Sequence, residues 1–404
     1  MIGIIADDAT GASDVAAALT RRGVRTALAF DADVDPSEVS GAGAVVVGLK
    51  TRTAERQHAV ALSLRALKSL QECGATRFYV KYCSTFDSTA DGNIGPITDA
   101  VADALGAAVV VTTPSAPRHR RSVYQGHLFV GDSLINETHM AQHPLTPMTD
   151  SSVPRLLQAQ TPHRVALLGH RIISQGEPAI RAAIADAQRD GVRHLVADAI
   201  HDDDLSILAA AVGDAPLTAG SAGLVEHLLQ SAPGTPTRSP SIGTRTVIIA
   251  GSCSRRTCEQ IDHYVAAGGA HYRVAAMVDS DEDQLVADGL GWFDAHPAGP
   301  VLFYSSQAAT ERVKADSGLS DRYERIAGRL AGGVRERGVR RIIVAGGETS
   351  GAVINALGVR VTLVESEAAP GVPWLYDGRS GTRLLLKSGN FGPPDLFTRE
   401  GGLA

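Results

Sequence analysis

Long apolar runs are missing from this sequence of 404 residues, of which 44% are hydrophobic and 20% are charged. No stretch approaches the roughly 20 apolar residues that a membrane-spanning helix needs. The opening residues, MIGIIADDATGASD, have no basic start and reach two aspartates after a few apolar residues, unlike a signal peptide. We therefore expect a cytoplasmic protein without a membrane partner.

Cysteine and charge of one sign are also scarce. The four cysteines, Cys73, Cys83, Cys253 and Cys258, form no C-x-x-C pair and no His/Cys spacing typical of zinc, which favours reduced thiols. The net charge of −6 is spread without long blocks of one sign. A nucleic-acid partner is therefore not expected, because its phosphates require a basic stripe. A small anionic substrate stays open, because a pocket can be locally positive.

Several catalytic signatures are absent as well. The sequence has no G-x-x-x-x-G-K-[ST] phosphate loop, no G-x-G-x-x-G after its first apolar run, and no G-x-S-x-G elbow. His139 and His143 have the spacing of helical metal ligands, but Pro144 follows directly and a third ligand is not evident. Residues 202–204, three aspartates, indicate the solvated first turn of a helix.

Short β-branched runs alternate with amphipathic stretches, which predicts α/β domains with mainly parallel sheets. The length favours two of them: residues 1–230, a linker at 231–244 that is rich in proline and hydroxyl residues, and residues 245–404. The stretch 55–74 has leucines at helical spacing, with Gly74 at its end. The predicted strands are 2–6, 24–30, 44–49, 77–82, 107–114, 164–169, 194–200, 246–251, 272–277, 301–306 and 340–347.

Ligands of open α/β sheets bind outside the carboxyl ends of the strands, so polar clusters that follow a predicted strand are candidate sites. The first is ADDATGASD: Asp7 and Asp8 leave the strand, Gly11 permits a tight approach, and Asp14 is expected in the first turn of the next helix. Helix capping needs one such residue. A carboxylate here can take a proton from a substrate hydroxyl or help to hold a metal.

The second cluster, KYCSTFDSTADGN at 81–93, is unusually polar for the end of a buried strand. Lys81 can neutralise an anionic group, Asp87 can accept a hydrogen bond from a hydroxyl, and Ser84, Ser88 and Asn93 offer neutral hydrogen bonds. A capped helix start at 92–101 explains one or two of these residues. It does not explain a lysine and an aspartate on one loop.

Two further clusters lie in the second half: AGSCSRRT at 250–257 and AGGETSGAV at 345–353. Glycine and hydroxyl residues between a strand and a helix N-terminus form an anion cradle from backbone N–H groups. Glu348 is unusual there unless it acts through a metal or a ribose. Two such cradles in one domain predict a nucleotide. The stretch LLLKSGNFG at 384–392 is polar after an apolar run in the same way.

Together these motifs resemble one family. IADDATGASD, KYCSTFDSTADGNIGP, VYQGHLFVGD, HPLTPMTD, AGSCS, AGGETSG, APGVPW and LKSGNFG are similar, in this order, to the four-carbon acid sugar kinases over nearly the whole chain. KYCSTFDST, VYQGHLFVGD and HPLTPMTD resemble the 3-oxo-tetronate kinase branch. The resemblance implies two α/β domains with the active site in the cleft between them. It also implies transfer of the ATP γ-phosphate, with Mg²⁺, to the 4-hydroxyl of 3-oxo-tetronate.

The resemblance also implies roles for individual residues. Asp8 is the first candidate for the catalytic base and Asp87 the second. Candidate substrate contacts are Asp7, Thr10, Lys81, Ser88 and Asn93. Candidate ATP contacts are Ser254, Gly346, Gly347, Glu348, Thr349 and Gly389. The metal ligands and the roles of Arg118, Arg120 and Arg121 stay open, and a homodimer is compatible with the sequence.

Three other functions stay open at this stage. The nearest is a kinase for D-threonate or D-erythronate, which differs only in the acid sugar. A hydroxy-acid dehydrogenase would bind NAD(P), and the missing dinucleotide signature counts against it. A non-catalytic sugar-acid sensor would not need two nucleotide cradles.

Overall fold

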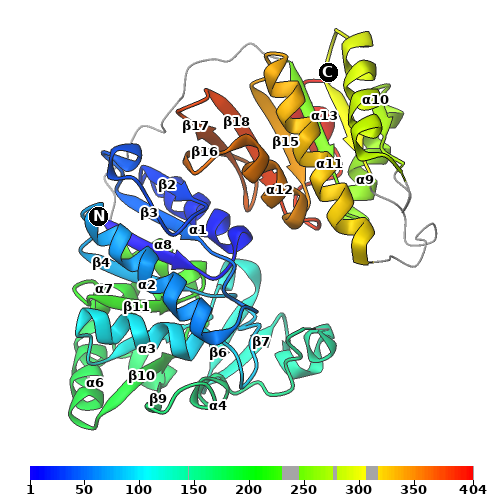
Figure 1. The fold of residues 1–404 in the computed structure, drawn as a ribbon. Coiled ribbons are helices and arrows are strands. Elements are labelled where there is room, and N and C mark those ends of the chain that lie inside the picture. Colours follow the sequence, from blue (N-terminus) through cyan, green and yellow to red (C-terminus); the bar gives the residue numbers. More distant parts are fainter. Residues whose placement is uncertain (144, 230–244, 276–279, 306–316, 404) are drawn as a thin grey trace. The chain divides into compact units, whose positions relative to one another are not determined.

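A computed structural model describes residues 1–143, 145–229, 245–275, 280–305 and 317–403. The chain forms two compact units, Met1–Thr235 and Pro236–Ala404. Both are α/β structures, so the predicted fold class is confirmed (Figure 1). The predicted 231–244 linker lies outside the described residues. The predicted interdomain cleft depends on the relative position of the two units and stays a prediction.

The first unit is built on a sheet whose strands all run parallel. In spatial order they are β2 (Thr26–Ala29), β3 (Ala44–Gly48), β1 (Ile2–Ala6), β4 (Arg77–Lys81), β11 (Leu217–Gly220), β5 (Val110–Thr113), β10 (Val192–Ala197) and β9 (Arg164–Leu168). The strands β1 and β3 are buried along their whole length, as expected for strands covered on both faces. Strand β11 was not predicted from the sequence; it inserts between β4 and β5 as the short segment LTAG.

Two groups of helices cover this sheet (Figure 1). In the first group α1 contacts α8, α8 contacts α7 and α7 contacts α6; in the second group α2 contacts α3 and α3 contacts α4. Their bounds are α1 (Ala9–Arg21), α2 (Arg56–Glu72), α3 (Ile94–Leu105), α4 (Val153–Gln158), α5 (His170–Ile173), α6 (Glu177–Arg189), α7 (Asp202–Val212) and α8 (Ala222–Leu228). The predicted helix 55–74 is α2, and Gly74 follows it with a φ of +90°. Helix α1 begins at Ala9, so Asp14 lies in its second turn and the prediction of the first turn was wrong.

A small antiparallel sheet and several short helical turns complete the unit, and the sequence did not predict them. The strands are β6 (Arg121–Tyr124), β7 (His127–Val130) and β8 (Ser133–Leu134). The turns are η1 (Pro36–Val39), η2 (Pro117–His119), η3 (Ile135–Glu137) and η4 (His139–Gln142). The buried carboxylate of Asp198, at the end of β10, accepts backbone hydrogen bonds from Gln125, Gly126 and His170, and so anchors the β6–β7 hairpin.

The second unit has a mixed sheet in which five strands run parallel and β17 and β16 run antiparallel to their neighbours. In spatial order the strands are β13 (Ala270–Arg273), β14 (Val301–Tyr304), β12 (Thr246–Ala250), β15 (Arg341–Ala345), β18 (Thr382–Lys387), β17 (Val372–Asp377) and β16 (Val361–Ala369). The helices are α9 (Arg255–Ala266), α10 (Glu282–Ala295), α11 (Ser317–Glu336), α12 (Gly347–Leu357) and α13 (Leu396–Gly401). β13 starts two residues before the predicted strand 272–277 and ends at Arg273; residues 276 and 277 of that prediction lie outside the described residues.

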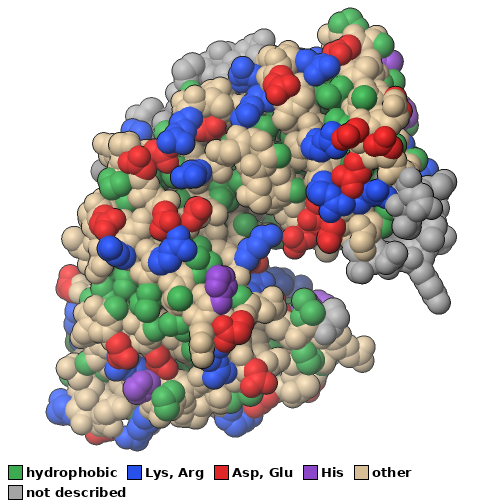
Figure 2. Space-filling view, in the orientation of Figure 1, with side chains coloured by type: hydrophobic (Ala, Val, Ile, Leu, Met, Phe, Trp, Pro, Cys, Tyr) green, Lys and Arg blue, Asp and Glu red, His purple; other side chains and the backbone are tan. Residues whose placement is uncertain are grey.

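One core cluster of the second unit lies between its sheet and the helices α9 and α13. Ile248, Tyr264, Trp374 and Phe397 are buried there together. On the face shown in Figure 2, acidic and basic side chains are interspersed, and the described residues form no continuous basic stripe on that face. No helix in the described part of the chain is long and apolar enough to cross a membrane.

Candidate functional site

The chain reverses its direction of winding at β1, which places two polar clusters side by side. From β1 it proceeds to β2 and β3 on one side, and β4 lies on the other side. Ala6 is in register with Gly48 of β3 and with Lys81 of β4, so the segments after these strands meet at one edge of the sheet. Such a switch point is where open α/β sheets bind ligands.

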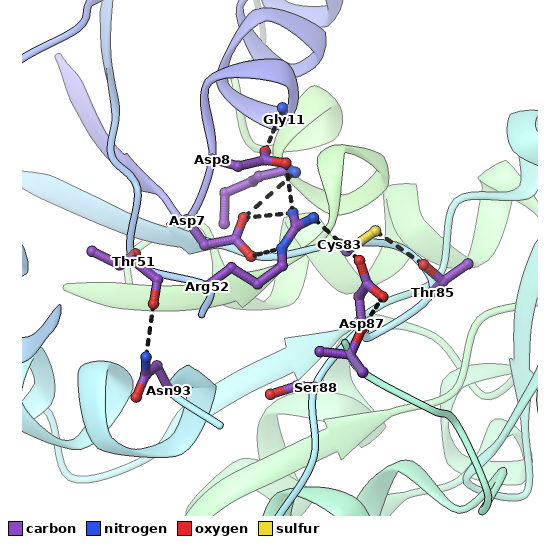
Figure 3. A network of polar contacts seen from close by, with 12 residues as sticks. Asp7, Asp8, Gly11, Thr51, Arg52, Cys83, Thr85, Asp87, Ser88 and Asn93 are labelled. Atoms are coloured by element: carbon purple, nitrogen blue, oxygen red, sulfur yellow. Dashed lines mark hydrogen bonds and ion pairs between the residues drawn. The ribbon is translucent and has the colours of Figure 1, made fainter. Parts of the chain in front are cut away.

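Arg52, four residues past β3, lies at the centre of this edge (Figure 3). Its Nε donates to Asp7 Oδ2 at 2.7 Å and its Nη2 to Asp7 Oδ1 at 3.1 Å, a bidentate pair. Nη2 also lies 2.9 Å from Asp8 Oδ2, and Nη1 donates to Asp87 Oδ2 at 3.2 Å. One guanidinium group therefore holds three carboxylates from two segments in fixed positions.

Lys81 is the second cation of the cluster and is buried at the end of β4. Its Nζ lies 4.0 Å from Asp7 Oδ1. Burial disfavours the charged amine, but Asp8 and Asp7 outweigh this effect and raise the pKa of Lys81. A Cβ at position 11 would overlap the Lys81 amino group, which explains the glycine there. Lys81 is thus a permanent buried positive charge beneath the start of α1.

Asp8 caps helix α1 and also presents an ionised carboxylate at this edge. As the N-cap of α1 its Oδ1 accepts from the backbone N–H of Gly11 at 2.6 Å. Burial acts to raise its pKa, but Lys81 and Arg52 prevail and lower the pKa of Asp8 below the ordinary value. Its side chain is 32% exposed, against 10% for Asp7 and 11% for Asp87. Asp8 is therefore the ionised carboxylate that a ligand reaches most easily.

Asp87 reaches the cluster from a strained turn. Phe86 and Asp87 have φ values of +60° and +52°, which residues other than glycine rarely adopt. Two consecutive residues of this kind cost on the order of 1–3 kcal/mol each and are typical of functional sites. The Asp87 carboxylate accepts from Thr146 Oγ1 at 2.7 Å and from Arg52. Both contacts fix its orientation.

A small cavity brings together four of the predicted substrate residues: Asp7, Lys81, Ser88 and Asn93. Arg52, Thr51, Ser63 and Tyr82 are further polar residues of its wall. Asn93 Nδ2 donates to the backbone oxygens of Thr51 and Ala54, at 2.7 and 2.9 Å. Within the described residues, the buried atoms Thr51 Oγ1 and Asn93 Oδ1 have no hydrogen-bond partner. The cavity has room for about one water molecule, which can satisfy both atoms.

Ser88 and Thr10 occupy different environments. Ser88 is buried, and its Oγ accepts from Gln160 Nε2 at 2.9 Å, so it also helps to hold the 88–95 loop. Thr10 is half-buried in the first turn of α1, next to Asp8, and does not line the cavity.

Other residues singled out in the sequence have structural contacts. Arg118 pairs with Glu226 at 3.2 Å, Arg120 pairs with Asp132 at 3.2 Å, and Arg121 donates to the backbone oxygen of His119. The aspartates 202–204 form the first turn of α7, as predicted, but only Asp202 and Asp203 are exposed; Asp204 is buried and accepts from the backbone N–H groups of Ile200 and His201. Three or more metal-ligating side chains are not clustered anywhere in the described residues, which include His139 and His143.

Arg52, Thr146 and Gln160 were not predicted as parts of this site. The signal for Arg52 was present, because LKTRT follows the predicted strand 44–49 as directly as the recognised clusters follow theirs. Thr146 and Gln160 approach the 81–93 loop from 59 and 72 residues farther along the chain, so only the folded structure reveals their contacts.

The second unit has its own switch point, between β12 and β15. The turn after β12 ends at Ser254, the N-cap of α9, and the turn after β15 ends at Gly346, which precedes α12. The segment after β18, the neighbour of β15, contributes Gly389. A Cβ at Gly389 would lie 2.8 Å from Ser254 Oγ, so the segments after β12 and β18 are in close contact.

Gly346 lies beside this contact, so the segments after β12, β15 and β18 together form one cradle. Its φ of +126° strains any other residue, and a Cβ there would lie 3.2 Å from the backbone nitrogen of Ser252. Gly347 and Glu348 are exposed in the first turn of α12, whereas Thr349 is buried against Gly251. The N-termini of two helices of 12 and 11 residues thus open beside glycine-rich turns, an arrangement suited to phosphate groups.

The chain also matches known proteins over nearly its whole length. Residues 2–228 match the family described as a sugar-binding N-terminal domain, and residues 247–397 match the family described as a nucleotide-binding C-terminal domain. The curated 3-oxo-tetronate kinase of Cupriavidus necator is 41% identical, over 98% of this chain and 95% of that protein. The 3-oxo-tetronate kinase of Salmonella typhimurium LT2 is 38% identical, over 98% of both chains.

Solved structures agree with these sequence matches. A crystal structure from Salmonella typhimurium LT2, named there as a putative tRNA synthase, superposes with a TM-score of 0.91 at 36% identity over 98% of both chains. The Haemophilus influenzae protein HI1011 superposes with a TM-score of 0.87 at 35% identity over 99% of both. Both the ordered motifs and the full-length matches thus lead to one conclusion: the chain belongs to the four-carbon acid sugar kinase family, in the branch of the 3-oxo-tetronate kinases.

Proposed function

We propose that this protein is an ATP-dependent kinase that phosphorylates the 4-hydroxyl of 3-oxo-tetronate. The observation that carries the proposal is the identity of about 40% with 3-oxo-tetronate kinases over nearly the whole chain. The geometry supports it, because each unit has a polar cluster at the switch point of its own sheet. The first cluster is charged and suits a small hydroxy acid, and the second is a glycine-rich cradle that suits phosphates.

In this proposal the acid sugar lies against the cavity of the first unit. Lys81 provides the positive charge for its carboxylate, because Arg52 is already shared among Asp7, Asp8 and Asp87. Ser88, Asn93 and Asp87 bind its hydroxyls. Asp8 accepts the proton of the attacking 4-hydroxyl, with Asp87 as the alternative base. The low pKa of Asp8 fits phosphoryl transfer, in which positioning dominates and the proton leaves the hydroxyl late.

ATP binds in the second unit, where Ser254, Gly346, Gly347, Thr349 and Gly389 surround its phosphates and Glu348 reaches its ribose or its metal. We propose that Mg²⁺ enters with the nucleotide as part of the substrate. A resident metal does not fit, because the carboxylates of Asp7, Asp8 and Asp87 are already held by Arg52. Magnesium in kinases is bound largely through phosphate oxygens and water.

The test is ATP consumption by the purified protein with Mg²⁺ and a panel of four-carbon acid sugars, with ³¹P NMR to locate the new phosphate. Turnover of 3-oxo-tetronate well above D-threonate and D-erythronate supports the proposal, and the reverse order assigns one of those acids instead. NAD(P)H formation without ATP use would assign a dehydrogenase, against which the names of the relatives count.

We also propose a cytoplasmic location, where ATP is available, and a small-molecule partner only. None of the four cysteines, all of which the structure describes, forms a disulfide. The homodimer stays a prediction, and light scattering on the purified protein tests it.

A further inference from the structure

The most unusual side chain outside the proposed catalytic cluster is Lys387, the last residue of β18. It is 2% exposed, in the middle of the second unit. Its Nζ donates to Thr257 Oγ1 at 2.8 Å and to the backbone oxygen of Gly389 at 3.0 Å. Both acceptors are neutral. A buried lysine normally has a carboxylate partner, because an isolated charge is costly to bury.

Lys81 is the natural comparison, since it is also buried at the end of a parallel strand. Lys81 has Asp7 and Asp8 beside it and stays charged. Among the described residues, no carboxylate lies within 4.0 Å of Lys387 Nζ. The sequence shows no difference between these two strand-end lysines, but the structure gives a counter-ion to only one of them.

The hydrogen bonds of Lys387 fit a neutral amine. A neutral amine has two N–H groups, and the two acceptors on Thr257 and Gly389 satisfy both. Protonation adds a third N–H for which the described residues supply no acceptor. Burial, and the positive charge of Arg256, lower the pKa of Lys387 to about 7. The neutral form of the amine is therefore accessible near neutral pH.

The charged groups on the surrounding helices do not change this picture. On α9, Arg256 is paired with Glu259 at 3.0 Å, and Arg255 is paired with the same glutamate at 2.8 Å. On α12, Glu348 is exposed. On α13, the ring of Phe397 faces the amine at 6.0 Å. The environment of Lys387 is thus neutral or weakly positive.

Lys387 is also directly connected to all three segments of the cradle. The Thr257 hydroxyl that accepts from Lys387 also accepts from Ser254 Oγ at 3.1 Å and donates to the oxygen of Gly389 at 3.0 Å. The backbone oxygen of Lys387 accepts from Gly346 N at 2.9 Å. An anion held by Ser254, Gly346 and Gly389 would lie within two hydrogen bonds of the amine, where its field is only weakly screened.

We propose that Lys387 is the proton-uptake site of nucleotide binding: its amine takes a proton from solvent when the polyanionic phosphates enter the cradle of Ser254, Gly346 and Gly389. The proposal rests on the proposed nucleotide function of this cradle. The reaction forms one N–H bond on Nζ and deprotonates one buffer acid. Lys387 is a positioning residue, because it acts through Thr257 and Gly389, and its new charge offsets that of the phosphates. Nucleotide affinity therefore weakens as the pH rises.

The experiment is titration calorimetry of the full-length protein with Mg-ADP at pH 8, where the nucleotide is fully ionised, in buffers of different ionisation enthalpy. If bound phosphate raises the pKa of Lys387 to about 8 or more, at least about 0.4 proton is taken up per nucleotide. Lys387→Met should abolish this uptake. Lys68→Met, at a lysine whose side chain is 79% exposed, should leave it unchanged.

A second measurement is independent of the variants. The slope of log Kd against pH for the wild-type protein between pH 6.5 and 9 equals the number of protons taken up. Nucleotide binding without uptake in the wild type, or uptake that persists in Lys387→Met, overturns the inference and leaves the kinase proposal intact. If Mg-ADP does not bind at any pH, the nucleotide function itself fails, and the inference fails with it.

Discussion

Replacement of Asp8 by asparagine separates the chemical function of this residue from its structural one. Asparagine is as good an N-cap as aspartate, so the Asp8→Asn variant keeps the hydrogen bond from Gly11 N and the start of α1. The fold tolerates the lost charge as well, because Arg52 keeps Asp7 and Asp87, and Lys81 keeps Asp7. We expect the free energy of unfolding to fall by about 1 kcal/mol or less.

Activity should respond much more strongly than stability. Removal of a general base lowers the rate by about 10²- to 10⁴-fold, equivalent to roughly 3–5 kcal/mol of transition-state stabilisation. We therefore expect kcat of Asp8→Asn to fall at least about 100-fold, while the Kd for Mg-ADP, which binds in the other unit, stays unchanged. The assays are ATP consumption at saturating 3-oxo-tetronate and calorimetric Mg-ADP binding.

Asp14→Asn is the matched control, because it removes an aspartate charge from the same helix. Asp14 lies in the second turn of α1, and its nearest ionic partner is His119 at 4.0 Å, away from Arg52. Its kcat should stay within about twofold of the wild type. A near-normal kcat in Asp8→Asn would refute Asp8 as the base, and Asp87→Asn would then be tested for the larger loss.

Three further predictions concern the two clusters and the acid response. Gly346→Ala should raise the Kd for Mg-ADP at least about tenfold, because the φ of Gly346 is +126° and Ser252 N lies close to the added Cβ. The control is Gly358→Ala, which also has a positive φ but lies in open space after α12. This variant should lose about 1 kcal/mol of stability and leave the Kd for Mg-ADP unchanged. Arg52→Met leaves three carboxylates without their shared cation, so urea denaturation should show a loss of about 3 kcal/mol, and an unchanged midpoint would contradict the network. Burial acts to raise the pKa of Asp8, but Lys81 and Arg52 lower it. The ionised Asp8 therefore stabilises the fold fully above its unfolded pKa of about 3.9, and this stabilisation is lost as the pH falls through the lower folded pKa. Urea midpoints measured from pH 6 to pH 3 should therefore fall less steeply in Asp8→Asn than in the wild type.

The sequence alone determined the fold class, most of the strands that carry the clusters, and most of the cluster residues. Hydrophobic periodicity is a local property, so β1, β3, β4, β12 and β15 could be recognised from their own residues. The polar segments after β1, β4, β12 and β15 were recognised too, because ligands of α/β sheets bind at the strand ends, whereas the segment after β3 that carries Arg52 was missed. The strands β16, β17 and β18 were not predicted, and neither was the short strand β11, whose residues LTAG have little β-branched character.

Only the tertiary structure decided which strand ends meet and what each polar group touches. Arg52 became the centre of the first cluster because β3 and β4 flank β1, and strand order is not encoded in any single segment. The same holds for the two buried lysines, which look alike in the sequence. Lys81 lies beside two carboxylates and Lys387 beside neutral oxygens, and the charge state of a buried amine depends on such neighbours, brought together from distant parts of the chain.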